Sequence, residues 1–388
     1  MRIAIFIDTF YPHLGGVEDT TALLASSLGA RGHQVDIYVP KIPSIEIDLG
    51  ENVRVHRFPS LRIPIDIPAR LAIPSGRGWR LLRQHRPDII HVHTIMSMGL
   101  ESLLASKLLK IPLVGTNHSI VSEFSPYAPF APKLLAYLAS HYDSWFFNQG
   151  EILTAPSQDV ITEMSKHGFS KPSCVISNQI DTETFCPSNE DKELLKESFG
   201  LAGRPLVSFA GRFALEKRVP VLLQAIALVR KEIPNVILAL AGHGAEEEKW
   251  RKLIAKLEIE DNVKFVGTLN KPDLAKLFQA SDVFAIASPV EAQSMVTLQA
   301  MACATPVVGV RDRALPEYVS DGETGYLVPT DDYEAMAEKI IYLLKNKELA
   351  QHLGQAGRKI AEQYSTQAIC TKWEEVYQRV IDNYNQGV

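Results

Sequence analysis

The side chains best suited to chemistry gather in residues 287–308, which read ASPVEAQSMVTLQAMACATPVV. The polar loop Ser288–Ser294 leads into a helix-compatible run, Met295–Cys303, and an apolar strand-like segment follows. A loop that enters a helix presents unpaired backbone N–H groups at the positive end of the helix dipole, which favours phosphate. Glu291 in the loop and Gln299 in the helix could then bind the hydroxyls of a sugar and a ribose. An ordinary helix–strand unit with one charged loop residue is the alternative.

A second segment supplies positive charge. The candidate strand Leu206–Ala210 ends in Gly-Arg, with Arg212 followed five positions later by Lys217, where a helix is expected to begin. Arg212 offers a fork of N–H donors and Lys217 a point charge. A diphosphate that departs as a glycosidic bond breaks needs such compensation. We therefore predict that both bind a diphosphate; the alternative is two solvated surface cations.

A histidine lies just past the candidate strand Leu113–Gly115, at residue 118. Ligands in open α/β sheets bind outside the carboxyl ends of the strands, so His118 is a candidate for contact with a reacting group. His91 and His93 lie close to another strand, and we interpret both as structural histidines. A structural role is also the alternative for His118.

Glycines follow several candidate strands. Gly15 and Gly16 precede a helix expected to start near Glu18, and paired glycines let the backbone approach a ligand closely. A tight turn alone explains them equally well. Gly242 follows a strand in the second half and suits the close passage of a nucleotide, while Val266 ends the next strand and would lie at the edge of the base.

The elements that must position these residues follow a regular order. Short apolar segments alternate with longer amphipathic ones, which predicts βαβ units and an α/β fold with two doubly wound domains. The candidate strands are Ile3–Ile7, Val35–Val39, Ile89–Val92, Leu113–Gly115, Ile152–Ala155, Leu206–Ala210, Val236–Ala241, Val263–Val266, Val283–Ala287 and Pro306–Val308. A last helix is expected from about Thr366 to Asn383, with apolar residues at helical spacing at Ile369, Trp373, Val376 and Val380.

The composition excludes several classes of function. The 388 residues suggest two large domains, and 46% hydrophobic with 22% charged residues indicate sizeable cores. A formal charge of -5 gives no global case for nucleic acid. Four cysteines without CxxC spacing argue against a zinc site or disulfide framework and favour a reducing compartment. The start reads as a strand rather than a signal peptide, and no segment approaches the ~20 apolar residues of a membrane span.

The segment 287–308 resembles the sugar-nucleotide signature of the family-4 retaining glycosyltransferases, which have a GT-B fold. Their usual pattern is Glu, Gly, a hydrophobic residue, Gly, and then a second Glu followed by Ala-Met-Ala. Here Ala292-Gln293-Ser294 replaces the glycine-bracketed triplet, Gln299 replaces the second Glu, and Ala304 stands where Gly is usual. The Gly-Arg of residues 211–212 with Lys217 also matches a motif of the family. Residues 178–181 resemble its Asn-Gly-Ile/Val-Asp segment, with Gln179 in place of Gly.

The resemblance implies a GT-B architecture of two facing Rossmann-like domains. Residues 1–180 would form the acceptor-side domain, 366–388 would be a helix that crosses back to it, and 181–365 would bind the nucleotide sugar. The implied reaction moves a hexose from a UDP-sugar or GDP-sugar to a hydroxyl acceptor with retention of anomeric configuration. No DxD ligand pair stands out, so we expect neither a metal nor another cofactor.

The resemblance also assigns roles to individual residues. The implied catalytic residues are His118, Arg212, Lys217 and Glu291. The implied nucleotide-sugar-binding residues are Gly15, Gly16, Gly242, Val266, Gln293, Ser294, Met295, Val296 and Gln299.

A lipid acceptor at the membrane surface is suggested by two segments. Residues 77–86 are basic, and residues 132–149 place apolar side chains near one helical face, including Trp145 and Phe146. This part of the chain, through residues 115–118 and Glu123, more loosely resembles bacterial diacylglycerol glucosyltransferases. We accordingly expect a cytoplasmic protein that can rest peripherally on a membrane. A solvated basic helix beside a core helix is the alternative.

Two other functions remain open at this point. The departures at Ala292 and Gln299 are compatible with a catalytically weak sugar-nucleotide-binding or scaffold protein of the same fold. An epimerase or a phosphorylase could share the two-domain shape, and a phosphorylase would need a pyridoxal lysine.

Overall fold

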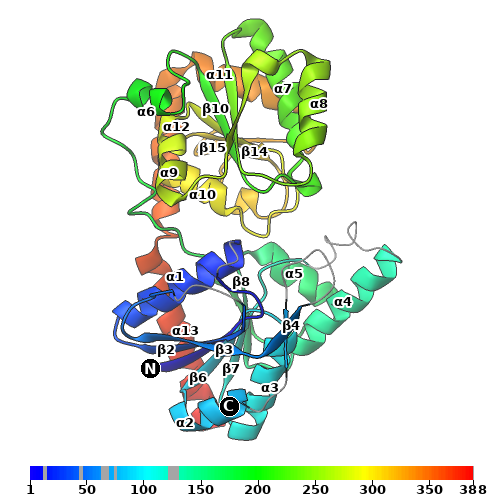
Figure 1. The fold of residues 1–388 in the computed structure, drawn as a ribbon, viewed down its shortest axis with the longest axis vertical. Helices are drawn as coiled ribbons and strands as arrows, with labels where there is room; N and C mark the ends of the chain where they lie inside the picture. The colour runs from blue at the N-terminus through cyan, green and yellow to red at the C-terminus, as the bar shows by residue number, and fades with distance from the viewer. Residues whose placement is uncertain (12–14, 43–46, 63–69, 74–76, 121–130, 388) are drawn as a thin grey trace. The chain divides into compact units, whose positions relative to one another are not determined.

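The computed structural model describes residues 1–11, 15–42, 47–62, 70–73, 77–120 and 131–387 (Figure 1). The chain divides into two compact units. Unit 1 comprises Met1–Gln179 and Thr366–Val388, and unit 2 comprises Ile180–Ser365. The division falls one residue before the boundary expected from the sequence. Over the described part of the chain, no helix combines the length and the apolar character needed to cross a membrane.

Unit 1 is built on a seven-stranded sheet in the order β3-β2-β1-β6-β7-β8-β9. All of its strand pairs are parallel, so their carboxyl ends share one edge. The strands are β1 (Arg2–Phe6), β2 (Gln34–Pro40), β3 (Val53–Phe58), β6 (Ile89–Val92), β7 (Leu113–Thr116), β8 (Ile152–Ala155) and β9 (Ser173–Val175). A separate antiparallel pair joins β4 (Ser60–Arg62) and β5 (Arg70–Ala72).

The helices of unit 1 include one from the end of the sequence. They are α1 (Gly16–Ala30), α2 (Arg77–His85), α3 (Ser97–Leu109), α4 (Pro132–Phe147), α5 (Gln158–Lys166) and α13 (Thr366–Gln386). α13 packs beside α1 (Figure 1). Its buried residues Ile369, Trp373 and Tyr377 join the core formed by β1, β2 and α1. The expected crossing of the last helix to the first domain is therefore confirmed.

Unit 2 repeats the doubly wound design on a six-stranded parallel sheet in the order β12-β11-β10-β13-β14-β15. Its strands are β10 (Leu206–Ala210), β11 (Ile237–Ala241), β12 (Val263–Gly267), β13 (Val283–Ile286), β14 (Val307–Val310) and β15 (Gly325–Val328). Its α-helices are α6 (Lys192–Ser198), α7 (Val219–Glu232), α8 (Glu247–Leu257), α9 (Lys271–Ala280), α10 (Met295–Ala302), α11 (Tyr333–Lys345) and α12 (Lys347–Glu362).

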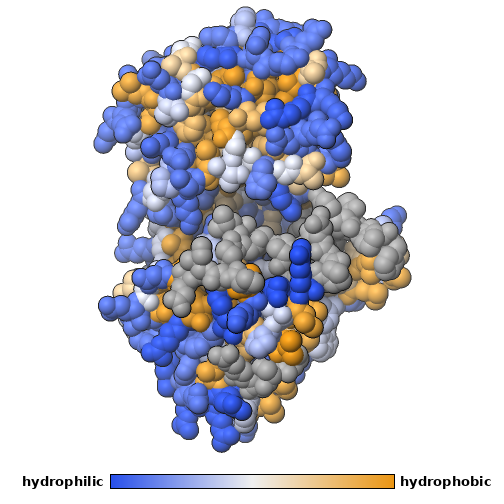
Figure 2. Space-filling model, in the orientation of Figure 1, coloured by the Kyte–Doolittle hydropathy of each residue, from blue (hydrophilic) through white to orange (hydrophobic). Residues whose placement is uncertain are grey.

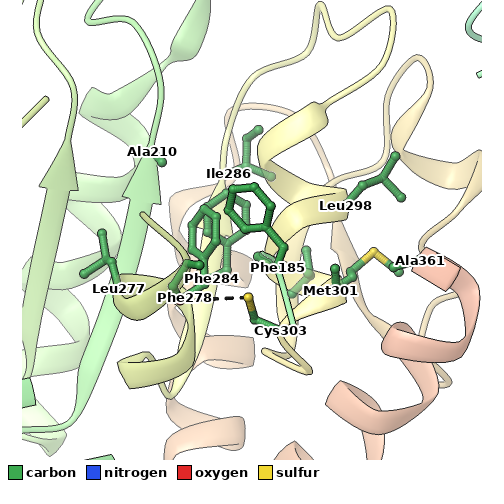
Figure 3. Packing of buried hydrophobic residues seen from close by; sticks show 14 of the residues in the cluster. Phe185, Ala210, Leu277, Phe278, Phe284, Ile286, Leu298, Met301, Cys303 and Ala361 are labelled. Atoms are coloured by element: carbon green, nitrogen blue, oxygen red, sulfur yellow. Dashed lines mark hydrogen bonds between the residues drawn. The ribbon is translucent and has the colours of Figure 1, made fainter. Parts of the chain in front are cut away.

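Helix α10 packs against the hydrophobic core of unit 2. Leu298 and Met301 of α10 belong to the same buried cluster as Phe278 of α9 and Phe284 and Ile286 of β13, several of which are labelled in Figure 3. All five side chains are almost fully buried. Burial of each such side chain contributes roughly 1.5–3 kcal/mol, so the helix that follows the Glu291 loop is firmly held.

The structure differs from the sequence predictions mainly in short strands. The strands β3, β4, β5, β9 and β15 were not predicted; β4, β5 and β9 have only three residues each, and β3 lies at an edge where its side chains are mostly half-buried or exposed. Pro306 lies outside β14, and Cys303 caps α10 rather than continuing it. Gln179, which stands where the family usually has glycine, does not have a positive φ, so the substitution requires no strained backbone there; its Nε2 donates to Thr20 O at 2.8 Å.

Candidate functional site

A lysine and a glutamate form a direct ion pair in unit 2. Lys217 ends the 3-10 helix η2 (Leu215–Lys217) after β10, and Glu291 lies in the loop after β13. Lys217 Nζ lies 2.6 Å from Glu291 Oε1, and Glu291 is only 8% exposed. Because β10 and β13 are neighbours in the sheet, two residues 74 positions apart can meet. Two of the four residues predicted to be catalytic are thus brought together.

Arg212 directly follows β10 but is not part of that pair. Its side chain is 65% exposed, and its Nη2 donates to Glu216 Oε1 at 2.7 Å. Glu216 belongs to no motif of the sequence, and its side chain is only 17% exposed. A guanidinium oriented by one carboxylate keeps its remaining N–H donors available for an anion.

Gly242 lies where two loops of unit 2 pass very close together. Its φ is +132°, and a Cβ there would lie 1.9 Å from Gly211 O. The loops are joined by hydrogen bonds from Gly211 N to Ala241 O and from Gly242 N to Gly267 O. The position therefore needs glycine for loop packing alone, which is independent of the predicted contact with a nucleotide.

The start of α10 holds the remaining predicted residues of unit 2. Ser294 is buried; its N–H donates to the Tyr318 hydroxyl at 3.0 Å, and its Oγ accepts from Thr297 Oγ1 at 2.8 Å. The other predicted residues are Gln293, which is buried, and Met295, Val296 and Gln299, which are half-buried. Met295, Val296 and the β12 residue Val266 pack against the unit 2 core, so their apolar side chains have a structural role as well.

Two side chains beside α10 were missed by the sequence analysis. Tyr318 is almost fully buried and fixes the Ser294 backbone, and burial raises its pKa well above the usual range for tyrosine. Ser288 follows β13, and its buried hydroxyl has no hydrogen-bond partner among the residues that the structure describes. A buried unpaired hydroxyl is costly and points to a possible ligand contact. Neither residue carries a motif that would have revealed it.

In unit 1, His118 lies on the loop after β7 and contacts a second histidine. Its Nε2 is 2.8 Å from Nδ1 of His93, and the two rings stack at 5.1 Å between centroids. We interpreted His93 as structural because of its place beside a strand. That interpretation is compatible with the structure, in which His93 contacts His118 and its own buried Nε2 has no hydrogen-bond partner among the described residues.

A third histidine extends the cluster toward the last helix. His91 bonds Tyr377 Oη at 2.7 Å through Nδ1 and Thr116 Oγ1 at 2.6 Å through Nε2, as expected of a structural histidine. Burial lowers the pKa of His91 and of His93 well below the usual range. Burial also lowers the pKa of His118 to about 4, against the opposing effect of Asn178. All three imidazoles are therefore neutral near pH 7.

The glycine pair of unit 1 starts α1, with Gly15 as its N-cap. The carboxylate of Glu18, which is buried, folds back over Gly15, and a Cβ there would lie 2.3 Å from Glu18 Oε2. Among the described residues, apart from its chain neighbours and the backbone of its own helix, nothing lies within 4 Å of a Cβ placed on Gly16. A carboxylate already faces the positive end of α1, which makes this helix start less suited to phosphate than the sequence suggested. Residues 12–14 before it and Glu123 lie outside the described residues.

Asp8 is a buried carboxylate two residues after strand β1, and it is fully hydrogen-bonded. It accepts hydrogen bonds from Thr94 Oγ1, Ser97 Oγ and the backbone N–H groups of Met96 and Met98, at 2.7 to 3.1 Å. It therefore caps α3 and has no capacity left for a base or nucleophile role.

Comparison with known families matches both halves of the chain. Residues 14–184 match the model of Glycosyltransferase Family 4, and residues 191–360 match the model of Glycosyl transferases group 1. The two matches are consecutive and together cover most of the chain.

Similar proteins from bacteria extend over the whole chain. The chain is 28% identical to N-acetyl-alpha-D-glucosaminyl L-malate synthase of Bacillus anthracis, with 100% of both chains covered. It is 25% identical to alpha-monoglucosyldiacylglycerol synthase of Acholeplasma laidlawii, covering 100% of this chain and 99% of that protein.

Solved structures show the same fold. The Anabaena protein HepE, in complex with UDP and glucose, superposes with a TM-score of 0.79 at 21% identity, over 98% of this chain and 100% of that one. Sucrose-phosphate synthase of Thermosynechococcus elongatus superposes with a TM-score of 0.80 at 21% identity, over 98% and 99% of the two chains. The expected arrangement of two doubly wound domains is confirmed.

Proposed function

Because the chain belongs to the family 4 and group 1 glycosyltransferases, which share the GT-B fold, we propose that it transfers a hexose from a nucleotide-diphosphate sugar to a membrane glycerolipid with retention of anomeric configuration. Transfer from a nucleotide sugar follows from the family. The choice of a glycerolipid as acceptor is the finer part of the proposal.

The observation that carries the donor half is the placement of charge in unit 2. Arg212 and Lys217 both follow β10, and Glu291 follows its neighbour β13, so all three lie at the carboxyl edge of the sheet. Ligands of doubly wound folds bind at that edge. Lys217 and Arg212 can compensate the charge of a departing diphosphate, while Glu291 orients Lys217 and can accept from sugar hydroxyls.

The reaction exchanges one bond at the anomeric carbon for another on the same face. The bond from the anomeric carbon to the diphosphate oxygen breaks, and its electron pair stays with the diphosphate. The acceptor oxygen forms the new bond, and its proton passes to a departing phosphate oxygen. The positive charges of unit 2 lower the barrier because negative charge grows on the leaving group. His118 would contribute a hydrogen bond as a neutral imidazole, since its pKa is about 4.

We propose in addition that this chemistry needs no metal. Two cations already stand at the proposed diphosphate site, and they supply the charge that a divalent ion would otherwise provide. Full transferase activity in excess chelator is the expected result. Loss of activity in chelator with recovery on adding magnesium or manganese would overturn this part.

The acceptor half is supported by an exposed apolar surface on α3 and α4. The two helices pack together where Gly99 of α3 meets the ring of Phe146. Hydrophobic residues gather over α4 in Figure 2. The exposed apolar side chains are Leu100, Leu104 and Leu108 on α3 and Leu134, Tyr137, Leu138, Tyr142 and Trp145 on α4. On each helix they recur at helical spacing on one face, as in helices that lie in a membrane interface.

Positive charge lies next to this surface. Helix α2 packs against α3 and carries the exposed side chains of Arg80 and Arg83, with Arg83 stacked 5.3 Å over the ring of Trp79. A basic helix beside an apolar one suits an anionic lipid surface. The sequence placed Phe146 on the same face as Trp145, but Phe146 is buried in the core and Trp145 is exposed.

Product analysis tests the proposal directly. The full chain would be incubated with UDP-glucose and with two acceptors, diacylglycerol in mixed micelles and L-malate, which the names of the two relatives suggest. We expect hexosyl-diacylglycerol as the product. A malate conjugate without glycolipid would overturn the acceptor while leaving the family assignment intact.

Binding to lipid vesicles tests the surface itself. Replacing Leu134 and Leu138 together by aspartate should lower the fraction bound to anionic vesicles by about tenfold or more, because their exposed apolar area no longer enters the interface. Leu194→Asp on α6 of unit 2 is the matched control, since Leu194 is equally exposed. Unchanged vesicle binding of the double variant would contradict a membrane role for α4.

A further inference from the structure

Three side chains from three elements of unit 1 converge on one point away from the proposed reaction. Asp36 comes from β2, His56 from the edge strand β3, and His85 from the end of α2. One ligand atom from each lies within 4.8 Å of the others. No other group of three His, Cys, Asp or Glu side chains is this close among the described residues.

The two oxygens of Asp36 face different imidazoles. His56 Nε2 lies 2.6 Å from Oδ1, and His85 Nδ1 lies 3.3 Å from Oδ2. The contact of His85 is close but lacks hydrogen-bond geometry, so its buried Nδ1 has no hydrogen-bond partner in the part of the chain that the structure describes. A ring nitrogen that faces a carboxylate oxygen without bonding it is arranged as ligands are around a shared ion.

The surroundings hold these ligands in place. The ring of His56 stacks on Tyr38 at 5.0 Å, and Tyr38 in turn stacks on Phe6 at 4.6 Å. The rings of His56 and His85 are 5.3 Å apart. Side-chain exposures of 17% for His56, 14% for Asp36 and 25% for His85 leave the cluster reachable from solvent.

We propose that Asp36, His56 and His85 bind a divalent transition-metal ion, Zn²⁺ in the first place, with water as the fourth ligand. Two imidazole nitrogens and one carboxylate oxygen form a ligand set that zinc accepts in tetrahedral sites that keep an open position. Magnesium and calcium prefer sites made of oxygen ligands alone. The negative charge of Asp36 partly neutralises the charge of a bound ion. The exposed Arg54, which is in register with Asp36, carries a positive charge that disfavours binding of the ion.

The place of the site in the sheet gives it a structural role. Asp36 lies near the amino end of β2, and His85 just precedes β6, whereas His118 follows the carboxyl end of β7. The ion would therefore bind at the edge of the sheet opposite the predicted catalytic histidine. It would tie the edge strand β3, which is paired on one side only, and helix α2 to the interior strand β2.

Metal titration of the full chain, without a histidine tag, tests the proposal. Isothermal titration with ZnCl₂ should show one ion per chain, and Zn²⁺ should raise the thermal midpoint. His85→Gln and Asp36→Asn should each weaken binding by about 100-fold or more, because each removes a direct ligand. His33→Gln is the matched control: His33 is also part-buried against a carboxylate, with Nε2 2.8 Å from Glu374 Oε1, but has no second imidazole partner.

Cobalt provides a readout that does not depend on the variants. Co²⁺ bound by the unaltered protein should give the intense visible absorption of a tetrahedral site, and Zn²⁺ should abolish it. Absence of zinc binding, or equal binding in His85→Gln and His33→Gln, would overturn the proposal and leave a hydrogen-bonded cluster. Should a variant fail to fold by circular dichroism, the cobalt spectrum of the unaltered protein decides.

Discussion

The two units share the doubly wound design, but the candidate residues at the carboxyl ends of their strands are charged in one unit and neutral in the other. In unit 2 the candidate residues are two cationic side chains and a carboxylate: Arg212 is mostly exposed, and Lys217 is paired with Glu291. In unit 1 the candidate His118 is held by His93 in a neutral cluster, because burial lowers both pKa values. The difference shows that the order of the strands determines where a site lies. The burial of each side chain determines whether the site acts through charged groups or through neutral hydrogen bonds.

The sharpest test of the charged site is Lys217→Ala. Removing a charge that compensates the leaving diphosphate should lower kcat/KM for the donor by about 100–1,000-fold. Steady-state transfer from UDP-glucose measures it. Lys249→Ala is the control, since Lys249 is 71% exposed and also paired with a glutamate, Glu246, at 2.6 Å. Equal effects of the two variants would remove the contrast between a charged site and a solvated ion pair.

Replacement of the neutral histidine should cost less. His118→Gln loses a hydrogen bond near developing charge, so we expect kcat to fall by about 10–100-fold. His93→Gln should also lower kcat, but by less, because His93 acts through His118. The kcat of the double variant should be no lower than that of His118→Gln. Fully additive losses would show that His93 acts elsewhere.

The neutral cluster also predicts how stability depends on pH. The pKa of His118 is about 4 in the folded chain and about 6.5 when unfolded, so the unfolded state binds more protons between these values. Stability should therefore fall as the pH drops from about 6.5 toward 4. Thermal unfolding at both ends of this window should show a smaller pH effect in His118→Gln than in the unaltered chain. The exposed His352→Gln should keep the full effect.

The smallest effect is expected at Gln299 on α10, where the family usually has glutamate. Gln299→Glu adds a charged acceptor for ribose hydroxyls, so donor affinity should stay equal or tighten by about tenfold at most. Calorimetric titration with UDP and with GDP measures it and compares the two bases. A large loss of affinity would refute the idea that a glutamate at this half-buried position serves the donor as well as glutamine does.

The architecture and the individual charged residues could be predicted from the sequence, but the contacts between those residues could not. Lys217 and Glu291 were predicted for different roles, since their pairing follows from the adjacency of β10 and β13, which chain order does not reveal. The contact of His93 with His118 was likewise not predicted, because it depends on β6 lying beside β7.

Burial was the other quantity that residue patterns resolved poorly. Trp145 and Phe146 are consecutive, and a helix turns them to different sides, so one is exposed and the other is in the core. Gly242 was predicted from its resemblance to a nucleotide loop, whereas the structure gives it a second reason in the close approach of Gly211. A motif indicates which residue types occur at a site, whereas the packing determines whether a residue has a structural role in addition to a role in binding.

Helix α13 has a consequence for how the molecule is made. Its residues leave the ribosome after unit 2 has been synthesised, yet Trp373 and Tyr377 fill the interior of unit 1, and Tyr377 bonds His91. During translation the core of unit 2 can therefore form first, while the apolar face of unit 1 that α13 covers stays exposed. A nascent chain stalled before residue 366 would accordingly offer that face to chaperones and proteases.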